Sequence, residues 1–124
     1  MRIIIAEPDT ARQRQLRTIL TSLGHRSGDV ETFTDSKGTL SAVRKKRYDL
    51  GFFSHIPGIF DGVKLVKDLR NGISKSMPVV LYSTLLDRET LLSANESGAN
   101  GFLAYPFSVS DVEGSILTAI KRAN

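Results

Sequence analysis

The feature that most constrains the fold is a regular alternation between short apolar runs and segments with helical periodicity. The apolar runs lie at residues 2–6, 50–53, 78–82 and 101–104, and a weaker segment at 26–32 is polar enough for a strand at the edge of a sheet. Apolar residues between them recur at helical spacing, as Leu16, Ile19 and Leu23 do, which predicts amphipathic helices. Strands that alternate with helices form a parallel sheet covered on both faces. The sequence therefore predicts an α/β fold, with a single domain over residues 1–124.

Polar residues mark where the predicted helices begin. Asp9 and Asp35 each precede a helical segment, where an aspartate can cap free backbone N–H groups. The helix after Asp35 is expected to run to about Arg47. Ser108 and Asp111 have the spacing of a capping box for the last helix. The inner stripe of that helix is expected to comprise Val112, Ile116, Leu117 and Ile120.

Composition excludes several kinds of chemistry. The chain has no cysteine, which rules out disulfides, thiolate catalysis and cysteine-ligated metals. Its two histidines, His25 and His55, match no zinc spacing. No apolar stretch reaches the roughly 18 residues that a membrane span needs. A cytoplasmic domain that does not enter the membrane is therefore expected.

The net charge of +4 is modest, and its densest cluster is the basic run 44–47. Cations at the C-terminal end of a helix suit the helix dipole, which is the simpler interpretation. A contact with nucleic acid or an acidic partner is the alternative. No aromatic residue interleaves with the run, so nucleic-acid binding by this domain alone is not expected.

The ends of the predicted strands carry the segments that identify a family. In parallel α/β sheets, ligands bind at the carboxyl ends of the strands. The segments at those ends resemble CheY-like response regulator receiver domains, in order along the whole chain: 3–9, 48–54, 57–62, 78–84 and 98–107. The resemblance implies a doubly wound, five-stranded parallel sheet of order 2-1-3-4-5 with five helices. It also implies a role in two-component or phosphorelay signalling.

The chain departs from the family at the residues that carry phosphoryl chemistry. Receivers transfer a phosphoryl group to an aspartate beside a magnesium ion and a lysine. The resemblance places Ser54 at the phospho-acceptor position, Glu7 and Pro8 at the acidic pair, and Tyr105 at the lysine. A serine without an adjacent base is a weak nucleophile, proline has no carboxylate, and a phenol carries no positive charge. These changes each remove charge, so the domain is expected to be stable without a metal.

The remaining positions of the pocket are closer to the family pattern. Ser83 matches the switch hydroxyl and Phe102 the switch aromatic, although Phe102 fits a plain core residue equally well. The Tyr105 ring is expected to fill space in the pocket, with its hydroxyl bonded to Glu7 or Ser54. The resemblance also implies a cis peptide bond between Tyr105 and Pro106.

These residues predict a degenerate receiver, or pseudo-receiver, that binds proteins independently of phosphate. It is not expected to be an enzyme or to need a cofactor. Magnesium binding is not expected, with Glu7 as the one weak candidate ligand because Asp9 serves as a cap. The expected partners are other signalling proteins or an attached output domain. By analogy with the family, a homodimer can form through the fourth helix, fifth strand and fifth helix.

Three alternatives remain at the level of the sequence. The chain can be a working phosphorelay receiver that uses another carboxylate, Asp61 or Asp9. It can be a regulator that contacts nucleic acid through residues 44–47. A nucleotide-binding enzyme of flavodoxin type is disfavoured, because residues 7–10 are acidic and contain none of the glycines that cradle a phosphate.

Overall fold

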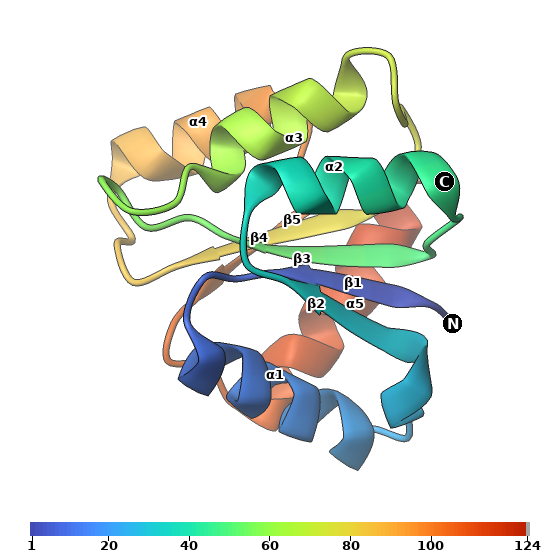
Figure 1. The fold of residues 1–124 in the computed structure, drawn as a ribbon. Helices are drawn as coiled ribbons and strands as arrows, with labels where there is room; N and C mark the ends of the chain where they lie inside the picture. The colour runs from blue at the N-terminus through green and yellow to red at the C-terminus, as the bar shows by residue number, and fades with distance from the viewer. Residues whose placement is uncertain (124) are drawn as a thin grey trace.

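The computed structural model describes residues 1–123, in which strands and helices alternate along the chain (Figure 1). The five strands are β1 (Ile3–Ala6), β2 (Val30–Phe33), β3 (Leu50–Ser54), β4 (Val79–Ser83) and β5 (Gly101–Ala104). The five α-helices are α1 (Thr10–Ser22), α2 (Ser36–Lys45), α3 (Gly62–Arg70), α4 (Arg88–Ser97) and α5 (Val109–Ala123). None of the helices in this described part is long and apolar enough to cross a bilayer.

The strands form one parallel sheet in the order β2-β1-β3-β4-β5, which confirms the predicted fold. Helices α1 and α5 cover one face of this sheet, and α2, α3 and α4 cover the other (Figure 1). The inner strands β1, β3 and β4 are buried along their whole length. Their near-continuous apolar sequence follows from this, because both sides of each strand face a layer of helices.

Alternation along each strand sends side chains into two separate cores. In β1, Ile3 and Ile5 pack with α1 and α5, whereas Ile4 packs with the opposite layer. In β4, Val80 and Tyr82 share the first core. This alternation decides which side of the sheet each residue near the strand ends faces, and so positions Tyr82 beside the start of α1.

An aspartate caps the N-terminus of four of the five α-helices. Two of these caps, Asp9 and Asp35, were predicted from the sequence. The four caps each accept a hydrogen bond from the backbone N–H three residues later: Asp9, Asp35, Asp61 and Asp87. At α5, the N–H of Ser108 donates to Asp111 while the N–H of Asp111 donates to the Ser108 hydroxyl, which confirms the capping box. The polar loops at this end of the sheet are thereby fixed in place.

The start of β2, the end of α2 and the buried face of α5 differ from the sequence prediction. Residues 27–29 form a 3₁₀ turn stabilised by a bond from Arg17 to the Ser27 carbonyl, so β2 begins only at Val30. Helix α2 ends at Lys45, because Lys46 has extended backbone angles. Leu117 is 67% exposed, since it lies about 140° around the helix from Val112 at roughly 100° per residue.

Gly62 gives a test of how tightly the loop after β3 packs on the sheet. A Cβ at this position would lie 2.1 Å from the Ser54 carbonyl oxygen, whereas one at Gly114 on α5 would meet nothing within 4 Å. We expect Gly62→Ala to lower the free energy of unfolding by about 1–3 kcal/mol. Gly114→Ala should raise it by about 0.5–1 kcal/mol through helix propensity. Urea denaturation measures both, and equal stabilities of the two variants would contradict the packing described.

Candidate functional site

The residues predicted for the site meet at the carboxyl ends of the strands. Glu7 directly follows β1, Ser54 ends β3, Ser83 ends β4 and Tyr105 directly follows β5. Strands β1, β3 and β4 are neighbours in the sheet, so the first three of these residues lie side by side. The structure therefore places these residues along one edge of the sheet, and their role as a functional site stays a prediction.

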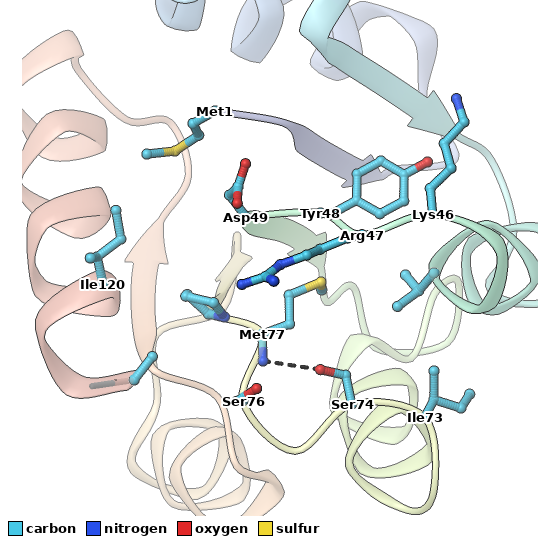
Figure 2. Close-up of a pocket in the computed structure, with 13 residues that line it drawn as sticks. Met1, Lys46, Arg47, Tyr48, Asp49, Ile73, Ser74, Ser76, Met77 and Ile120 are labelled. Carbon is cyan, nitrogen blue, oxygen red and sulfur yellow. Dashed lines mark hydrogen bonds between the residues drawn. The ribbon is translucent and has the colours of Figure 1, made fainter.

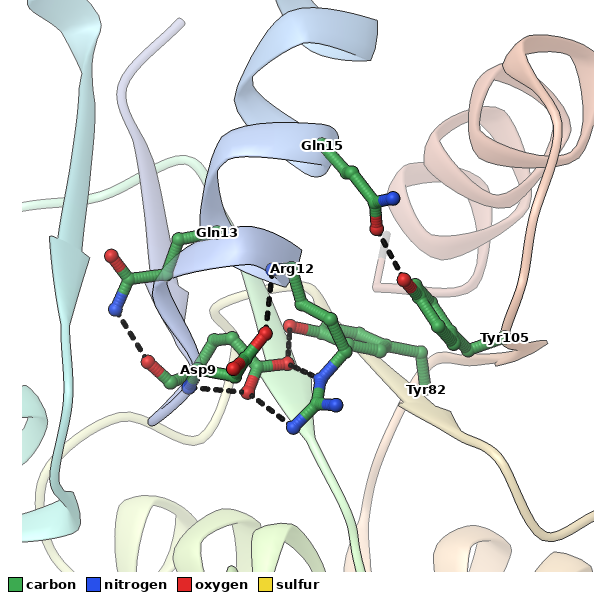
Figure 3. Close-up of polar contacts among 7 residues, drawn as sticks. Asp9, Arg12, Gln13, Gln15, Tyr82 and Tyr105 are labelled. Atoms are coloured by element: carbon green, nitrogen blue, oxygen red, sulfur yellow. Dashed lines mark hydrogen bonds and ion pairs between the residues drawn. The ribbon is translucent and has the colours of Figure 1, made fainter.

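The Glu7 carboxylate is the centre of this site, and it is completely buried. Its Oε1 accepts hydrogen bonds from Arg12 Nε and from the Tyr82 hydroxyl, each at 2.9 Å (Figure 3). Its Oε2 accepts from the backbone N–H of Asp9 at 3.0 Å and from Arg12 Nη2 at 3.2 Å. Both oxygens therefore have two donors, which is what a carboxylate removed from water requires.

Arg12 supplies the positive charge that balances Glu7. It comes from the first turn of α1, and its guanidinium forms a two-pronged ion pair with the carboxylate. The hydrogen bond that Arg12 donates to Glu7 raises the pKa of Arg12 above its ordinary value. On its other side, the guanidinium carbon lies 5.9 Å from the centre of the Tyr105 ring, within the range of a cation–π contact.

Tyr82, on strand β4, lies on the sheet side of the site. Its ring is buried in the core between the sheet and helices α1 and α5, and it packs on Phe107 with ring centres 5.5 Å apart. Burial, followed by the charge of Glu7, raises the pKa of the Tyr82 phenol well above its ordinary value. The hydroxyl therefore keeps its proton and remains a donor to Glu7.

The two serines at the strand ends are buried, with almost no contact with solvent. Ser54 is fully buried, and its Oγ has no hydrogen-bond partner among the described residues. Ser83 is also buried, and its Oγ accepts the backbone N–H of Leu85 at 3.1 Å. His55 faces away from both, since its Nδ1 accepts the backbone N–H of Val63 at 3.3 Å. No side chain positioned as a base therefore contacts Ser54 within the described chain.

Tyr105 and Phe102 lie at the edge of the site. The predicted bond from Tyr105 to Glu7 or Ser54 is wrong: the Tyr105 hydroxyl donates to the side chain of Gln15 (Figure 3). The physical reason is that Arg12 and Tyr82 already use the Glu7 oxygens. The Tyr105–Pro106 bond is cis, as the resemblance implied. Phe102 is half-buried and packs against the core beneath α3 and α4.

The other carboxylates at this end of the sheet serve as helix caps. Asp9 Oδ2 accepts the backbone N–H of Arg12 at 2.9 Å. Asp61 Oδ1 accepts the backbone N–H of Lys64 at 2.9 Å, although the Asp61 side chain is still 62% exposed. The expected cap at Asp9 is confirmed, and Asp61 is an exposed acid at the same end of the sheet.

The resemblance implies a magnesium ion at this site, and the residues present do not fit one. Magnesium takes oxygen ligands, usually carboxylates, with free lone pairs. The Glu7 oxygens are saturated by donors, Pro8 offers no carboxylate, and Asp9 is engaged as a cap. Within residues 1–123, no cluster of three or more Asp, Glu, His or Cys side chains could hold a metal. The cation at Glu7 is instead the Arg12 guanidinium.

Sequence reasoning missed both partners of Glu7. Arg12 lies five residues after it and Tyr82 lies 75 residues after it. The available signal for Tyr82 is its position one residue before the end of β4, which turns its side chain toward the α1 layer. The signal for Arg12 is weaker, because a basic residue in the first turn of a helix opposes the dipole and needs another reason to be there.

Removing the donors to Glu7 should cost stability. Arg12→Met leaves the buried carboxylate without its cation, and we expect a loss of about 2–3 kcal/mol in the free energy of unfolding, less than for a fully buried pair. Tyr82→Phe removes one donor and should cost about 1–3 kcal/mol. Arg14→Met, on the exposed side of α1, is the matched control and should change stability by less than about 0.5 kcal/mol. Chemical denaturation that ranked Arg14→Met with Arg12→Met would refute the role of the ion pair.

Known proteins with similar sequences support one family. The chain is 28% identical to the KDP operon transcriptional regulatory protein KdpE of Escherichia coli over 124 aligned residues, covering 97% of this chain and 51% of that protein. It is 24% identical to the chemotaxis protein CheY-3 of Vibrio cholerae, covering 98% and 93%. The chain spans about half the length of the curated transcriptional regulators that it matches.

Solved structures agree on the fold. The signal receiver domain of a modulated diguanylate cyclase from Desulfovibrio desulfuricans superposes with a TM-score of 0.80 at 26% identity, over 98% of this chain and 94% of that one. A two-component response regulator from Clostridium difficile gives 0.85 at 22% identity, over 100% and 98%. Residues 3–117 match the family described as the response regulator receiver domain. The chain belongs to the response regulator receiver domain family.

Proposed function

We propose that this chain is a receiver domain of two-component signalling that does not accept a phosphoryl group and acts by binding other proteins. The single observation that carries the proposal is the neutralised site: Glu7 is paired with Arg12 and bonded to Tyr82 inside the fold. A phosphoryl group and its metal need open carboxylate oxygens. Here those oxygens are committed to the protein's own donors.

The position of Ser54 supports the same proposal. The resemblance aligns Ser54 with the acceptor aspartate, and its hydroxyl is buried, neutral and without an adjacent base. A serine would form a stable phosphate ester, not the reactive acyl phosphate of a receiver. We therefore propose a pseudo-receiver that is not an enzyme, needs no magnesium and works in the cytoplasm.

Exposed leucines near the proposed interface support a binding role. Helix α4 exposes Leu91 and Leu92, and α5 exposes Leu117 at 67%. Leu85 and Leu86, in the loop before α4, are also exposed. We propose that these leucines contribute to one interaction surface, because contiguous apolar patches mark binding sites. The proposed partners are another signalling protein, an output domain on the same polypeptide, or a second copy through α4, β5 and α5.

A second candidate function rests on Asp61. Its carboxylate is 62% exposed at the same end of the sheet as Ser54 and lies beside His55 at 3.6 Å. An exposed aspartate can act as an alternative acceptor, which would make the chain a working phosphorelay receiver. Its use as the α3 cap argues against this, because the Lys64 N–H already binds Oδ1 and holds the carboxylate in the capping position.

Phosphoryl transfer distinguishes the two candidates. We expect no covalent phosphate on the intact domain after incubation with acetyl phosphate and magnesium, followed by intact-mass spectrometry. A receiver that is known to accept phosphate is the positive control in the same buffer. A labile phosphate mapped to Asp61, and absent from the Asp61→Asn variant, would establish the second function and overturn the first.

The exposed leucines of α4 and α5 have a test of their own. We expect Leu92→Asp and Leu117→Asp to leave the circular dichroism spectrum unchanged, because both side chains are exposed. Each change should weaken self-association, which light scattering measures as a mass that depends on concentration. If the partner is an output domain, each change should instead weaken capture of this chain by the co-expressed output domain. Lys67→Asp on α3, also exposed, is the control. Association that survives both leucine changes would exclude a role for these leucines.

A further inference from the structure

A second cavity lies at the amino ends of the strands, at the opposite end of the sheet from Glu7. Its volume is about 880 Å³, within the range of roughly 300–1,000 Å³ that small-ligand sites occupy. Its walls come from the start of β1, the connection between α2 and β3, the connection between α3 and β4, and the end of α5 (Figure 2). Nothing in the site around Glu7 uses this cavity.

The lining combines an apolar surface with donors to an anion. The apolar residues include Val43, Ile73, Met77 and Ile120. Arg47 extends into the cavity above Met77, whereas Lys46 points outward (Figure 2). Ser74 and Ser76 face the same space. The Ser74 Oγ accepts the backbone N–H of Met77 at 3.1 Å, so its own proton is free to be donated.

Of the two basic residues that line the cavity, Lys46 and Arg47, only Lys46 has a partner in the described part of the fold. Among residues 1–123 Arg47 makes no ion pair or side-chain hydrogen bond, whereas neighbouring Lys46 pairs with Glu31 at 2.7 Å. It also lies beyond the end of α2 at Lys45, so the helix dipole does not account for it. The acidic lining residue, Asp49, has one oxygen engaged by the backbone N–H of Arg2 at 2.7 Å.

We propose that this cavity binds a small phosphomonoester with an apolar body, of about the size of a mononucleotide. Arg47 pairs with the phosphate, and the hydroxyls of Ser74 and Ser76 donate to its oxygens. The apolar body lies on Ile73 and Met77. Such a ligand would join the two connections that precede β3 and β4 and stabilise the fold by mass action. The same phosphomonoester chemistry occurs in free nucleotides and in the head group of phosphatidic acid.

Titration of the intact domain with adenosine 5′-monophosphate, followed by ¹H–¹⁵N NMR, tests the proposal. We expect shifts of the Ser74, Ser76 and Met77 amides with the monophosphate and none with adenosine. Arg47→Gln should weaken binding at least about tenfold, as for a lost charge-assisted hydrogen bond. Arg44→Gln changes the net charge equally on exposed α2 surface outside the cavity, and should weaken binding less than about twofold.

A second arm separates the sources of the ligand. The domain is sedimented with phosphatidylcholine vesicles that contain phosphatidic acid. Co-sedimentation that Arg47→Gln abolishes, together with no NMR response to the monophosphate, would identify the lipid head group as the ligand. Absence of a response to both probes would overturn the proposal. So would equal weakening by Arg44→Gln and Arg47→Gln. These readouts do not involve phosphoryl transfer, so their failure is distinguishable from failure of the pseudo-receiver proposal.

Discussion

The buried carboxylate of Glu7 has to be neutralised, and the way this chain does so determines the rest of the site. A carboxylate with no water around it is stable only with donors at both oxygens. Arg12 supplies the charge and two of the bonds, Tyr82 a third, and the Asp9 backbone the fourth. All of these donors belong to the protein, so the charge balance is complete in the folded chain and does not depend on a ligand.

Under the proposed function, this internal balance explains how a receiver fold can be stable without a bound metal or phosphate. The order of the strands, the two cores and the aspartate caps depend on features outside the site. The strand ends hold a compact ion pair and neutral groups, while leucines of α4 and α5 are exposed on the surface. If the proposed function holds, such a domain would present the same surface to its partners whether or not a phosphodonor is present.

The fold was predictable from the sequence because its signals are local: apolar runs gave the strands, and Asp9 and Asp35 gave helix starts. The positions of Glu7, Ser54 and Ser83 followed from where strands end. The partners of Glu7 were not predictable in this way, since Tyr82 reaches it across 75 residues. The incorrect partner for Tyr105 has the same cause: a side-chain hydrogen bond depends on which donors already occupy the acceptor, and this is fixed only in three dimensions.

The most direct test of the neutralised site is a crystal structure of the domain soaked with beryllofluoride and magnesium, which together mimic the phosphorylated state. The expected result is that neither is bound beside Ser54 and that Arg12 remains paired with Glu7. Density for both at the end of β3, with Arg12 displaced from the carboxylate, would contradict it.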